Sequence, residues 1–600
     1  MSAVREYTTP PRTEVGADED LTDILVTNAE RYPQRVAILR NVGGAWQDVT
    51  NAQLLAEVTA VAKGLCEAGV EPGDRVALLA RTRYEWTVLD FAIWFAGAVT
   101  VPVYETSSAE QVEWILNDSG SRACVVETPA HAAVVESLRD RLGELGDVWI
   151  IDDGALQQLA EKGALIEDAE IARRREARNA ETLATVIYTS GTTGRPKGCE
   201  VTHGNFLFEL RSAVDLLDDV FTEDASTLLF LPLAHVFARV IQIGVLMGRA
   251  KLAHSPDVTH LIEDLGVVKP TFLLAVPRVF EKVFNGASQT AHADSAAKGR
   301  IFDAAAETAI AYSRALDHGT PGMMIRAKHA LFDKLVYAKL RAALGGEIRY
   351  AISGGAPLGD RLSHFYRGIG LVIFEGYGLT ETTAAASVNA TTAIRLGTVG
   401  QPLPGVSIRI AEDGEILVKG ANLLRGYWRN PDATRDAVDR EGWFATGDLG
   451  ELDSEGFLRI TGRKKEIIVT ASGKNVAPSV IEDRVRAHPL ISQCMVVGDG
   501  QPYVAALITL DAEALEAWAN QLGKTAHTAA GLAGDADLIK AVQSAIDEGN
   551  NAVSRAEAVK RFRVLDVDLT EQSGHLTPKL SLKRSVIMKD FAAEIDALYS

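Results

Sequence analysis

Residues 184–198 read "ATVIYTSGTTGRPKG". The first six residues are mostly apolar and β-branched, which predicts a buried strand, and the next residues alternate hydroxyl and glycine side chains. The glycines would let backbone N–H groups approach a ligand closely, while the hydroxyls and a lysine add donors and positive charge, which suits phosphate oxygens. The candidate phosphate-binding residues are Thr189, Ser190, Gly191, Thr192, Thr193, Gly194 and Lys197.

This loop follows a predicted strand, as a Walker loop does. The Walker spacing GxxxxGK[ST] is absent, however, so a kinase-type P-loop is excluded. For the loop by itself, a solvated glycine and threonine turn remains the alternative.

Outward from this loop, short β-branched runs alternate with amphipathic stretches from about residue 75 to 375. Runs such as "RVALLA" (75–80) and "TFLLAV" (271–276) are typical of βαβ units and largely parallel sheets. The most apolar stretch, 89–104, is too short to span a bilayer and predicts a buried helix that runs into a strand.

The pattern of residue types along the sequence changes twice more. Residues from about 286 to 345 are Ala-rich and charged, which predicts a helical insertion without strands. After about 395, short alternating runs with the turn dipeptides Asp413-Gly414 and Glu455-Gly456 predict a small β-subdomain. We therefore expect an α/β protein with a large N-terminal domain of two βα-type sheets and this subdomain (1–464), followed by a smaller, mobile α+β domain (465–600).

Composition limits the function classes. A chain of 600 residues and 64.4 kDa predicts at least two domains, and a net charge of −19 argues against nonspecific nucleic-acid binding. The four cysteines have no CxxC spacing, so we expect neither disulfides nor a zinc site but a reduced, cytoplasmic setting. The first twenty residues lack the apolar core of a signal peptide and predict a flexible arm.

A second polar motif, "EGYGLTETT", covers residues 375–383. Tyr377 could stack on a purine, and Glu381 supplies an oxygen ligand of the kind that Mg²⁺ favours. The motifs "SGGAPLG" (353–359), "WFATGDLG" (443–450) and "GRKKEIIVTASGKNVAP" (462–478) also occur. With the first loop, this ordered set resembles the adenylate-forming superfamily of acyl-CoA synthetases, luciferases and peptide-synthetase adenylation domains.

The resemblance implies a role for each motif. Tyr377 would flank adenine, Thr380 would contact the α-phosphate or the acyl carboxylate, and Glu381 would bind the metal. Asp448 would accept hydrogen bonds from the ribose hydroxyls, and Arg463 would bind ribose or phosphate. The nucleotide-binding set also includes Gly354, Gly355, Ala356, Pro357, Glu375, Gly376 and Gly378, with Thr189 as a second donor to the metal.

The same resemblance assigns roles outside the nucleotide site. Lys465 would be the pivot between two orientations of the C-terminal domain, and Gly473 would line the path of the pantetheine arm. His235, in "LPLAHVFARV" (231–240), would position or gate the acyl carboxylate. The alternatives are a basic solvated hairpin around Lys465 and a purely structural histidine.

The C-terminal lysine of the family has no direct match. Long-chain members read LTPTLKLKR where this chain reads "LTPKLSLKR" (576–584), so Ser581 occupies the lysine position. Lys579 and Lys583 flank it at a period of two, which in a strand places all three side chains on one face. We favour Lys579 as the substitute, with Lys583 as the alternative; both could instead be surface lysines.

The resemblance implies a two-step ligation that needs ATP, Mg²⁺ and coenzyme A. The sequences of the motifs are most similar to those of long-chain fatty acyl-CoA synthetases. Candidate acyl-binding residues lie in 235–248 and 276–280, where buried helices would explain the apolar character equally well. The alternatives are an acyl-AMP ligase, an aryl or medium-chain ligase, and a non-catalytic fatty-acid uptake protein. Peripheral membrane contact suits so insoluble a substrate, but no basic amphipathic segment demands it.

Overall fold

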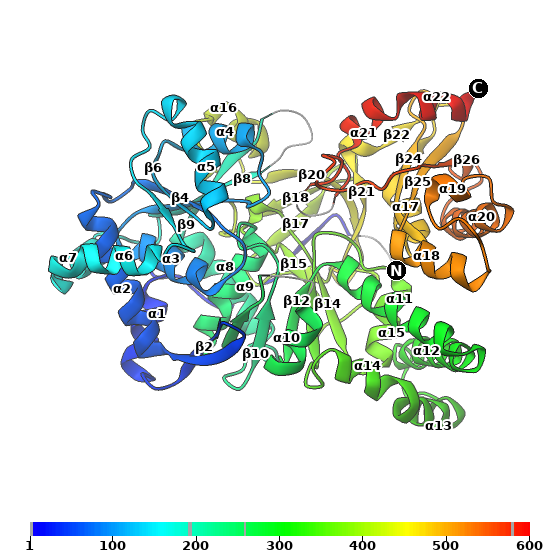
Figure 1. The fold of residues 1–600 in the computed structure, drawn as a ribbon, viewed down its shortest axis with the longest axis horizontal. Coiled ribbons are helices and arrows are strands. Elements are labelled where there is room, and N and C mark those ends of the chain that lie inside the picture. Colours follow the sequence, from blue (N-terminus) through cyan, green and yellow to red (C-terminus); the bar gives the residue numbers. More distant parts are fainter. Residues whose placement is uncertain (1–3, 190–194, 257–259, 578–580) are drawn as a thin grey trace.

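The computed structural model describes residues 4–189, 195–256, 260–577 and 581–600. Two large sheets form the N-terminal part (Figure 1). The first has the order β19-β9-β8-β5-β4-β6-β7. Its strands are β4 (Arg75–Leu79), β5 (Val99–Val103), β6 (Ser121–Val126), β7 (Val148–Ile150), β8 (Leu183–Thr189), β9 (Lys197–Thr202) and β19 (Gly426–Tyr427).

The second sheet has nine strands in the order β16-β15-β14-β13-β12-β10-β11-β2-β3. They are β2 (Val36–Val42), β3 (Ala45–Thr50), β10 (Ser226–Leu229), β11 (Lys251–His254), β12 (Phe272–Ala275), β13 (Tyr350–Ser353), β14 (Val372–Tyr377), β15 (Ser387–Val388) and β16 (Gln401–Pro402). Strands β2 and β10 to β14 pair in parallel, as the βαβ pattern of the sequence predicts.

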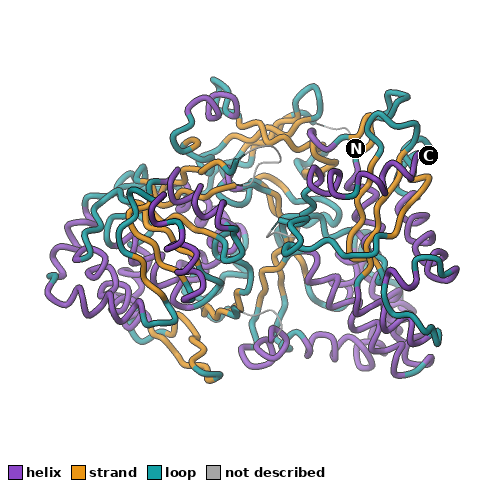
Figure 2. Tube along the Cα trace, turned by 45° about the horizontal axis from the view of Figure 1, so that its top comes forward, coloured by secondary structure: helices purple, strands orange, loops and turns teal. Residues whose placement is uncertain are grey.

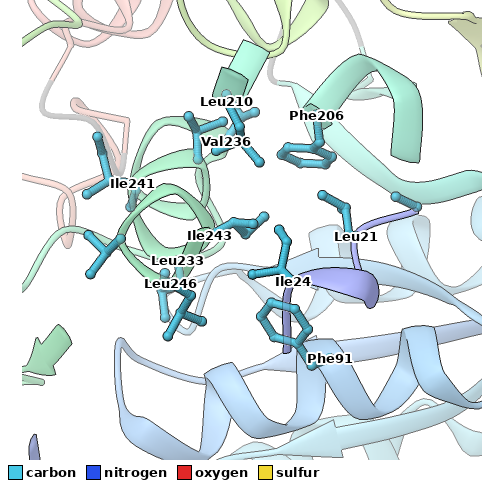
Figure 3. Packing of buried hydrophobic residues seen from close by; sticks show 14 of the residues in the cluster. Leu21, Ile24, Phe91, Phe206, Leu210, Leu233, Val236, Ile241, Ile243 and Leu246 are labelled. Atoms are coloured by element: carbon cyan, nitrogen blue, oxygen red, sulfur yellow. The ribbon is translucent and has the colours of Figure 1, made fainter. Parts of the chain in front are cut away.

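Two helices join these sheets. Helix α8 (His203–Leu216) contacts β9 of the first sheet, α9 (Val236–Met247) contacts β10 and β11 of the second, and the two helices contact each other. Helix α8 begins at a capping box in which Thr202 accepts a hydrogen bond from the backbone of Asn205. Figure 3 shows Ile243 on the side of α9 that faces Leu21 and Ile24, whereas Ile241 points to the opposite side. One face of α9 is therefore core.

The predicted helix and strand in 89–104 are confirmed. Helix α3 (Tyr84–Phe95) is followed by β5, and α3 packs on α2 (Asn51–Glu67) in the core between the sheets. Within the described part of the chain, no helix is long and apolar enough to cross a membrane.

Helices cover the other face of the second sheet. They are α10 (Leu261–Val268), α11 (Pro277–Asp294), α12 (Ala296–Leu316), α13 (Met323–Phe332), the π-helical turn Asp333–Tyr337, α14 (Ala338–Ala343) and α15 (Asp360–Gly368). Phe280, Phe284 and Phe302 from α11 and α12 pack with the strands in a second core. Close helix contact needs Gly368, because a Cβ there would lie 2.1 Å from the carbonyl oxygen of Ala309.

The β-subdomain is a five-stranded sheet in the order β1-β17-β18-β20-β21. Its strands are β1 (Glu6–Thr8), β17 (Ser407–Ile410), β18 (Glu415–Lys419), β20 (Phe444–Leu452) and β21 (Leu458–Arg463). The predicted turns at Gly414 and Gly456 join β17 to β18 and β20 to β21, and both glycines have φ near +85° (+86° and +84°).

The prediction of a flexible N-terminal arm is wrong. Residues Glu6–Thr8 form β1, which pairs antiparallel with β17. The ring of Tyr7 lies so close to Gly456 that a Cβ there would be 2.4 Å from it. The partner strand is about four hundred residues away in sequence, which a local pattern does not reveal.

The C-terminal elements gather at one end of the molecule (Figures 1 and 2). A hairpin of β22 (Ile468–Val469) and β23 (Asn475–Val476) precedes α17 (Pro478–Arg486), and β24 (Ile491–Val497), β25 (Val504–Leu510) and β26 (Val559–Val564) form a sheet. The remaining helices are α18 (Ala512–Gln521), α19 (Ala529–Leu532), α20 (Ala536–Asn550), α21 (Arg584–Asp590) and α22 (Ala592–Tyr599). The fold is α/β, with a large N-terminal domain of mixed sheets, a β-subdomain and a C-terminal domain, as predicted.

Candidate active site

The candidate phosphate loop joins two antiparallel strands of the first sheet. Thr189, the last residue of β8, pairs with Lys197, the first residue of β9. Ser190, Gly191, Thr192, Thr193 and Gly194 lie outside the described residues. The loop therefore closes a hairpin, and no helix follows it as one follows a Walker loop. The Thr189 hydroxyl lies 3.9 Å from Sγ of Cys199.

Tyr427 links this loop to the candidate metal residue. Its hydroxyl donates a hydrogen bond to Oε1 of Glu381 at 3.0 Å, and Nζ of Lys197 lies 5.1 Å from the centre of its ring. Strand β19 places Tyr427 here by pairing with β9, opposite Cys199. The motif analysis missed Tyr427; the aromatic pair Tyr427-Trp428 after Gly426 is the signal that could have drawn attention to it.

Three predicted nucleotide-binding residues from separate motifs meet at a second point. The hydroxyl of Tyr377 donates to Oδ2 of Asp448 at 2.8 Å, and Nε of Arg463 lies 3.0 Å from Oδ1. Asp448 on β20 and Arg463 on β21 are register partners in the β-subdomain, whereas Tyr377 ends β14 of the second sheet. Burial raises the pKa of Asp448, which Arg463 opposes, and burial raises that of Tyr377 well above its ordinary value.

Gly354 and Gly355 are required for different structural reasons. A Cβ on Gly354 would lie 3.2 Å from the ring of Phe237 and 3.5 Å from the carbonyl oxygen of Gly376, so three motifs converge there. Gly355 has φ of +85° and forms, with the exposed Ala356 and Pro357, the turn after β13.

Two residues of the motif "EGYGLTETT" are tied to the protein. A Cβ on Gly378 would lie 1.6 Å from the carbonyl oxygen of Ala384, so this glycine permits a tight backbone turn. The buried carboxylate of Glu375 accepts hydrogen bonds from the backbone of Leu358 and the hydroxyl of Ser363, both at 3.0 Å. The carboxylate of Glu375 therefore holds the turn that follows β13, and a contact of this residue with the nucleotide stays a prediction.

Thr380 and His235 begin helical turns beside this convergence. Thr380 is buried and opens the 3-10 turn Thr380–Thr382 directly after β14. His235 is the N-cap of α9: its Nδ1 accepts a hydrogen bond from the backbone of Phe237 at 3.0 Å. The hydrogen bond assigns the acceptor role to Nδ1, which leaves the proton of a neutral ring on Nε2.

An apolar cavity lies between α8 and α9 and the second sheet. Its lining includes Leu210, Ala213 and Leu217 of α8, Phe237, Val240, Ile241 and Gly244 of α9, and Ile352, Ala384 and Val388. The Ile241 face of α9, within the stretch 235–248, lines this cavity of about 40 Å³, and the acyl-binding role of the stretch stays a prediction. The other stretch, 276–280, does not line it: Phe280 belongs to the core with Tyr366.

Glu209 is the polar residue in the wall of this cavity. Its Oε1 accepts a hydrogen bond from the backbone of Ala385 at 2.8 Å, and among the described residues its Oε2 has no hydrogen-bond partner. Complete burial raises its pKa well above the ordinary value, because an apolar environment disfavours the charged form of a carboxyl group. No motif pointed to Glu209, because its neighbours in α8 are apolar and its position is set by the packing of α8.

The predicted hinge lies between two groups of ion pairs. Nζ of Lys464 contacts Asp413 at 2.5 Å and Glu415 at 2.8 Å, both in the β17–β18 hairpin. On the other side, Glu466 lies 3.5 Å from Nε of Arg584 at the start of α21. Lys465, between them, is exposed. Gly473 turns the β22–β23 hairpin with φ of +78° and has open space where a Cβ would lie.

The described residues at the two ends of the C-terminal lysine motif pair with each other. Leu576 bridges to Leu582, and the backbone N–H of Thr577 donates to the carbonyl oxygen of Ser581 at 2.9 Å. Leu576 and Leu582 form an isolated bridge outside the named strands, and the expectation that residues 579, 581 and 583 share one face of a strand stays a prediction. Lys579 lies outside the described residues, and Lys583 is the N-cap of α21.

This C-terminal segment contacts the sheet edge that carries the phosphate loop. Strands β5 and β8 are parallel neighbours, so both end at the same edge. The hydroxyl of Thr106, just after β5, donates to Glu571 at 2.5 Å. Figure 1 shows the red chain before α21 reaching from the C-terminal elements toward the middle of the molecule.

Comparisons with known proteins bear on this site. The family model "AMP-binding enzyme" matches residues 25–428, and "AMP-binding enzyme C-terminal domain" matches 465–600. A Mycobacterium tuberculosis protein, "Long-chain-fatty-acid--CoA ligase FadD15", is 49% identical over 601 residues, which cover 100% of both chains. The Xenopus laevis protein "Long-chain-fatty-acid--CoA ligase ACSBG2" is 29% identical, over 95% of this chain and 82% of its own.

Solved structures share the fold. An anthranilate CoA ligase with anthranoyl-AMP, AuaEII, has a TM-score of 0.73 at 19% identity, over 97% of this chain and 99% of its own. A Bacillus subtilis o-succinylbenzoate CoA synthetase with ATP and magnesium has a TM-score of 0.67 at 22% identity, over 94% and 98%. A Mycobacterium tuberculosis fatty acyl CoA synthetase has a TM-score of 0.62 at 24% identity, over 96% and 99%.

Proposed function

The chain belongs to the AMP-binding enzyme family, and we infer that it is a long-chain fatty-acid–CoA ligase that uses ATP and coenzyme A as substrates. The observation that carries this is the 49% identity to a long-chain-fatty-acid–CoA ligase across the whole of both chains. We also propose a cytoplasmic location, because the cysteines have no disulfide or zinc spacing.

We propose that the phosphates bind at the β8–β9 hairpin. Lys197 would supply positive charge to the β- and γ-phosphates that leave as pyrophosphate, and its ring contact with Tyr427 fixes where the ammonium group lies. The Glu381 carboxylate fits Mg²⁺, which binds proteins through one or two carboxylates plus substrate phosphates. Mg²⁺ would neutralise phosphate charge, and Tyr427 would orient Glu381 for it.

The nucleoside would bind where Tyr377, Asp448 and Arg463 meet. Without a ligand, the Asp448 carboxylate already has a hydroxyl donor and a guanidinium partner. Ribose hydroxyls would replace these partners, since a buried carboxylate needs donors in either state. Release of the Tyr377 hydroxyl would leave its ring free to lie against adenine.

The fatty acid would place its chain along the apolar side chains between α8 and α9, where the cavity of about 40 Å³ would have to widen to admit it, and its carboxylate near His235 and Thr380. Burial of each methylene group stabilises binding by about 0.8 kcal/mol, so a long chain binds mainly through this wall. Glu209 lies in this wall, and burial against an acyl chain would further disfavour the charged form of its carboxyl group.

The reaction has two steps. A carboxylate oxygen of the fatty acid attacks the α-phosphorus of ATP and the bond to pyrophosphate breaks; then the sulfur of coenzyme A attacks the acyl carbon, the bond to AMP breaks and the thiol proton is lost. The protein supplies positioning and charge stabilisation. We propose Lys579 for the charge at the α-phosphate, with Lys583, whose side chain makes no capping hydrogen bond at the start of α21, as the alternative.

We propose residues 1–464, with a helical insertion near 286–345 and the β-subdomain from about 395, and residues 465–600 as two domains that turn about Lys465 between these steps. The ion pairs support this. Lys464 is bound to the β-subdomain and Glu466 to α21, so the backbone between them can turn while both sets of ion pairs stay intact.

Pyrophosphate release and thioester formation, measured across acids with and without coenzyme A, test the function. Thioester should form with long-chain acids and depend on coenzyme A, and K197A and E381Q should abolish pyrophosphate release while leaving fatty-acid binding intact. The matched control K251Q changes an exposed lysine on β11. Thioester from aromatic or short acids alone, or transfer only to a carrier protein, would reject the proposal, and fatty-acid binding with no pyrophosphate release would indicate a binding protein.

A further inference from the structure

Helix α13 and the π-helical turn after it carry large apolar side chains on the outside of the protein. Met323 is 87% exposed, Met324 74%, Leu331 56% and Leu335 46%. Figure 1 shows α13 at the lower edge of the molecule, away from the C-terminal elements. Contiguous apolar surface of this kind marks an interaction site.

The inner face of this segment is fixed, so the outer face has a defined orientation. Tyr337 is fully buried and its hydroxyl donates to the carbonyl oxygen of Ala305 at 2.7 Å. The His329 ring stacks on Tyr312 at 3.9 Å, and its Nε2 lies 2.6 Å from the carbonyl oxygen of Gly368. The exposed methionines and leucines therefore do not belong to a loose helix that could turn inward.

Positive charges flank the apolar side chains. Residues 323–343 contain five cationic side chains, Arg326, Lys328, Lys334, Lys339 and Arg341, against one acidic side chain, Asp333, in a chain whose net charge is −19. Asp333 is already paired with Arg341 at 2.8 Å. Lys328, Lys334 and Lys339 are exposed, and each lies within four residues of Leu331 or Leu335 in sequence. Lys328 and Leu331, three residues apart on α13, are neighbours on its surface.

We propose that this surface, defined by residues 323–339, docks the protein on an anionic lipid bilayer. Apolar side chains that insert at the headgroup boundary, with lysines whose stems reach the phosphates, are what an interfacial amphipathic helix requires. The excess of positive charge favours an anionic bilayer over a second copy of this chain, because a symmetric dimer would bring two cationic surfaces together. The surface is separate from the site of ATP and acid, so its test is independent of the ligase reaction.

Co-sedimentation of the full-length protein with vesicles tests this. Equimolar phosphatidylglycerol and phosphatidylcholine vesicles should bind it, and pure phosphatidylcholine vesicles should bind it far more weakly. Each lysine near an anionic surface contributes roughly fivefold to binding, so K328Q/K334Q/K339Q should lower the partition coefficient about 100-fold. Raising the ionic strength to about 1 M, where the Debye length is about 3 Å, should also release the protein.

A second variant, M323S/M324S, tests insertion separately from charge and should lower binding about tenfold or more even at low salt. The control K251Q/K540Q/K589Q makes the same change in net charge on β11, α20 and α21 and should bind as wild type does. All variants should form thioester from monomeric fatty acid at the wild-type rate.

Three outcomes would overturn the proposal. The first is equal binding of the wild type to both vesicle types. The second is wild-type vesicle binding by both surface variants. The third is that the surface variants dissociate a dimer, seen by light scattering, and still bind vesicles as the wild type does.

Discussion

Replacing Arg239 by methionine would test how α9 is held between the two sheets. Nε of Arg239 donates to Oδ2 of Asp90 at 2.8 Å, Nη2 donates to Oδ1, and Nη1 donates to the Thr185 hydroxyl at 2.7 Å. Both charged side chains are fully buried, and the guanidinium lies over the rings of Trp86 and Trp94. Arg239 thus connects α9, which begins after His235, to α3 and β8.

The magnitude follows from what Arg239→Met leaves behind. Methionine fills much of the space, so the change in packing is small, but two charge-assisted hydrogen bonds to Asp90 are lost at about 1.5–3 kcal/mol each. Asp90 keeps the Thr100 hydroxyl at 2.8 Å as a donor and loses its counter-charge. We expect a loss of about 3–5 kcal/mol in the free energy of unfolding at neutral pH.

The loss should depend on pH. Burial raises the pKa of Asp90 and Arg239 opposes that rise, so the variant raises the folded-state pKa further. A carboxyl group with a raised folded-state pKa destabilises the folded state as pH rises above its unfolded value, about 3.9, toward the folded value. The deficit of the variant should therefore shrink as the pH is lowered from about 7 toward about 4.

Urea denaturation followed by tryptophan fluorescence measures this, since Trp86 and Trp94 lie beside Arg239. The double variant D90N/R239M removes both charges and should recover about 2 kcal/mol relative to R239M. A loss below about 1 kcal/mol in R239M, or a double variant no more stable than the single one, would refute the reasoning.

Three further changes probe the site and the domain arrangement. Lys465→Pro restricts the backbone φ and should leave pyrophosphate release within about twofold while slowing thioester formation at least about tenfold in quenched-flow measurements; equal rates in both steps would remove the hinge assignment. Asp448→Asn weakens a charge-assisted acceptor and should raise the KM for ATP about 10- to 100-fold, whereas an unchanged KM would place the ribose elsewhere. Asp483 on α17 has its pKa raised to about 7, first by burial and then by Glu482 and Glu281, despite Arg486. The wild type should lose thermal stability relative to Asp483→Asn as pH rises from about 4 through 7, and parallel pH profiles would contradict this.

Continuous apolar runs were sufficient to predict central strands of the two sheets. The β-branched run 184–189 is β8, and 271–276 contains β12, because buried parallel strands are continuous apolar runs. Pairings between distant residues were not predictable in this way. Strand β1 forms by pairing with β17, and β19 forms by pairing with β9. With three and two residues, these strands are too short to show a periodic pattern in the sequence.

The basic amphipathic segment was missed for a related reason. Residues 286–345 are rich in alanine throughout, and the π-helical turn Asp333–Tyr337 changes the helical period after α13, so Leu335 does not continue a regular pattern from Met324 and Leu331. Its exposure depends on anchors such as Tyr337, whose partner Ala305 lies on a different helix.

For the site, the sequence indicated which residues to consider and the packing showed what each contacts. Tyr377, Asp448 and Arg463 come from separate motifs and meet in the structure. Glu375 belongs to the same motif as Tyr377, but its carboxylate holds the turn at Leu358. Glu209 has no motif, because a buried carboxyl group in a helix can be recognised only from its surroundings.

The ion pairs beside Lys465 have a consequence for the balance between domain orientations. A rotation there would break neither the contacts of Lys464 nor that of Glu466. Among the described residues, two other polar contacts join the domains, one from Thr106 to Glu571 and one from Arg278 to Asp511. A rotation would have to break both. A partly exposed ion pair contributes about 0–1 kcal/mol, so the two orientations would differ by an amount that the binding of one ligand can reverse. Substrate occupancy, rather than stored strain, would then select the orientation at each point of the catalytic cycle.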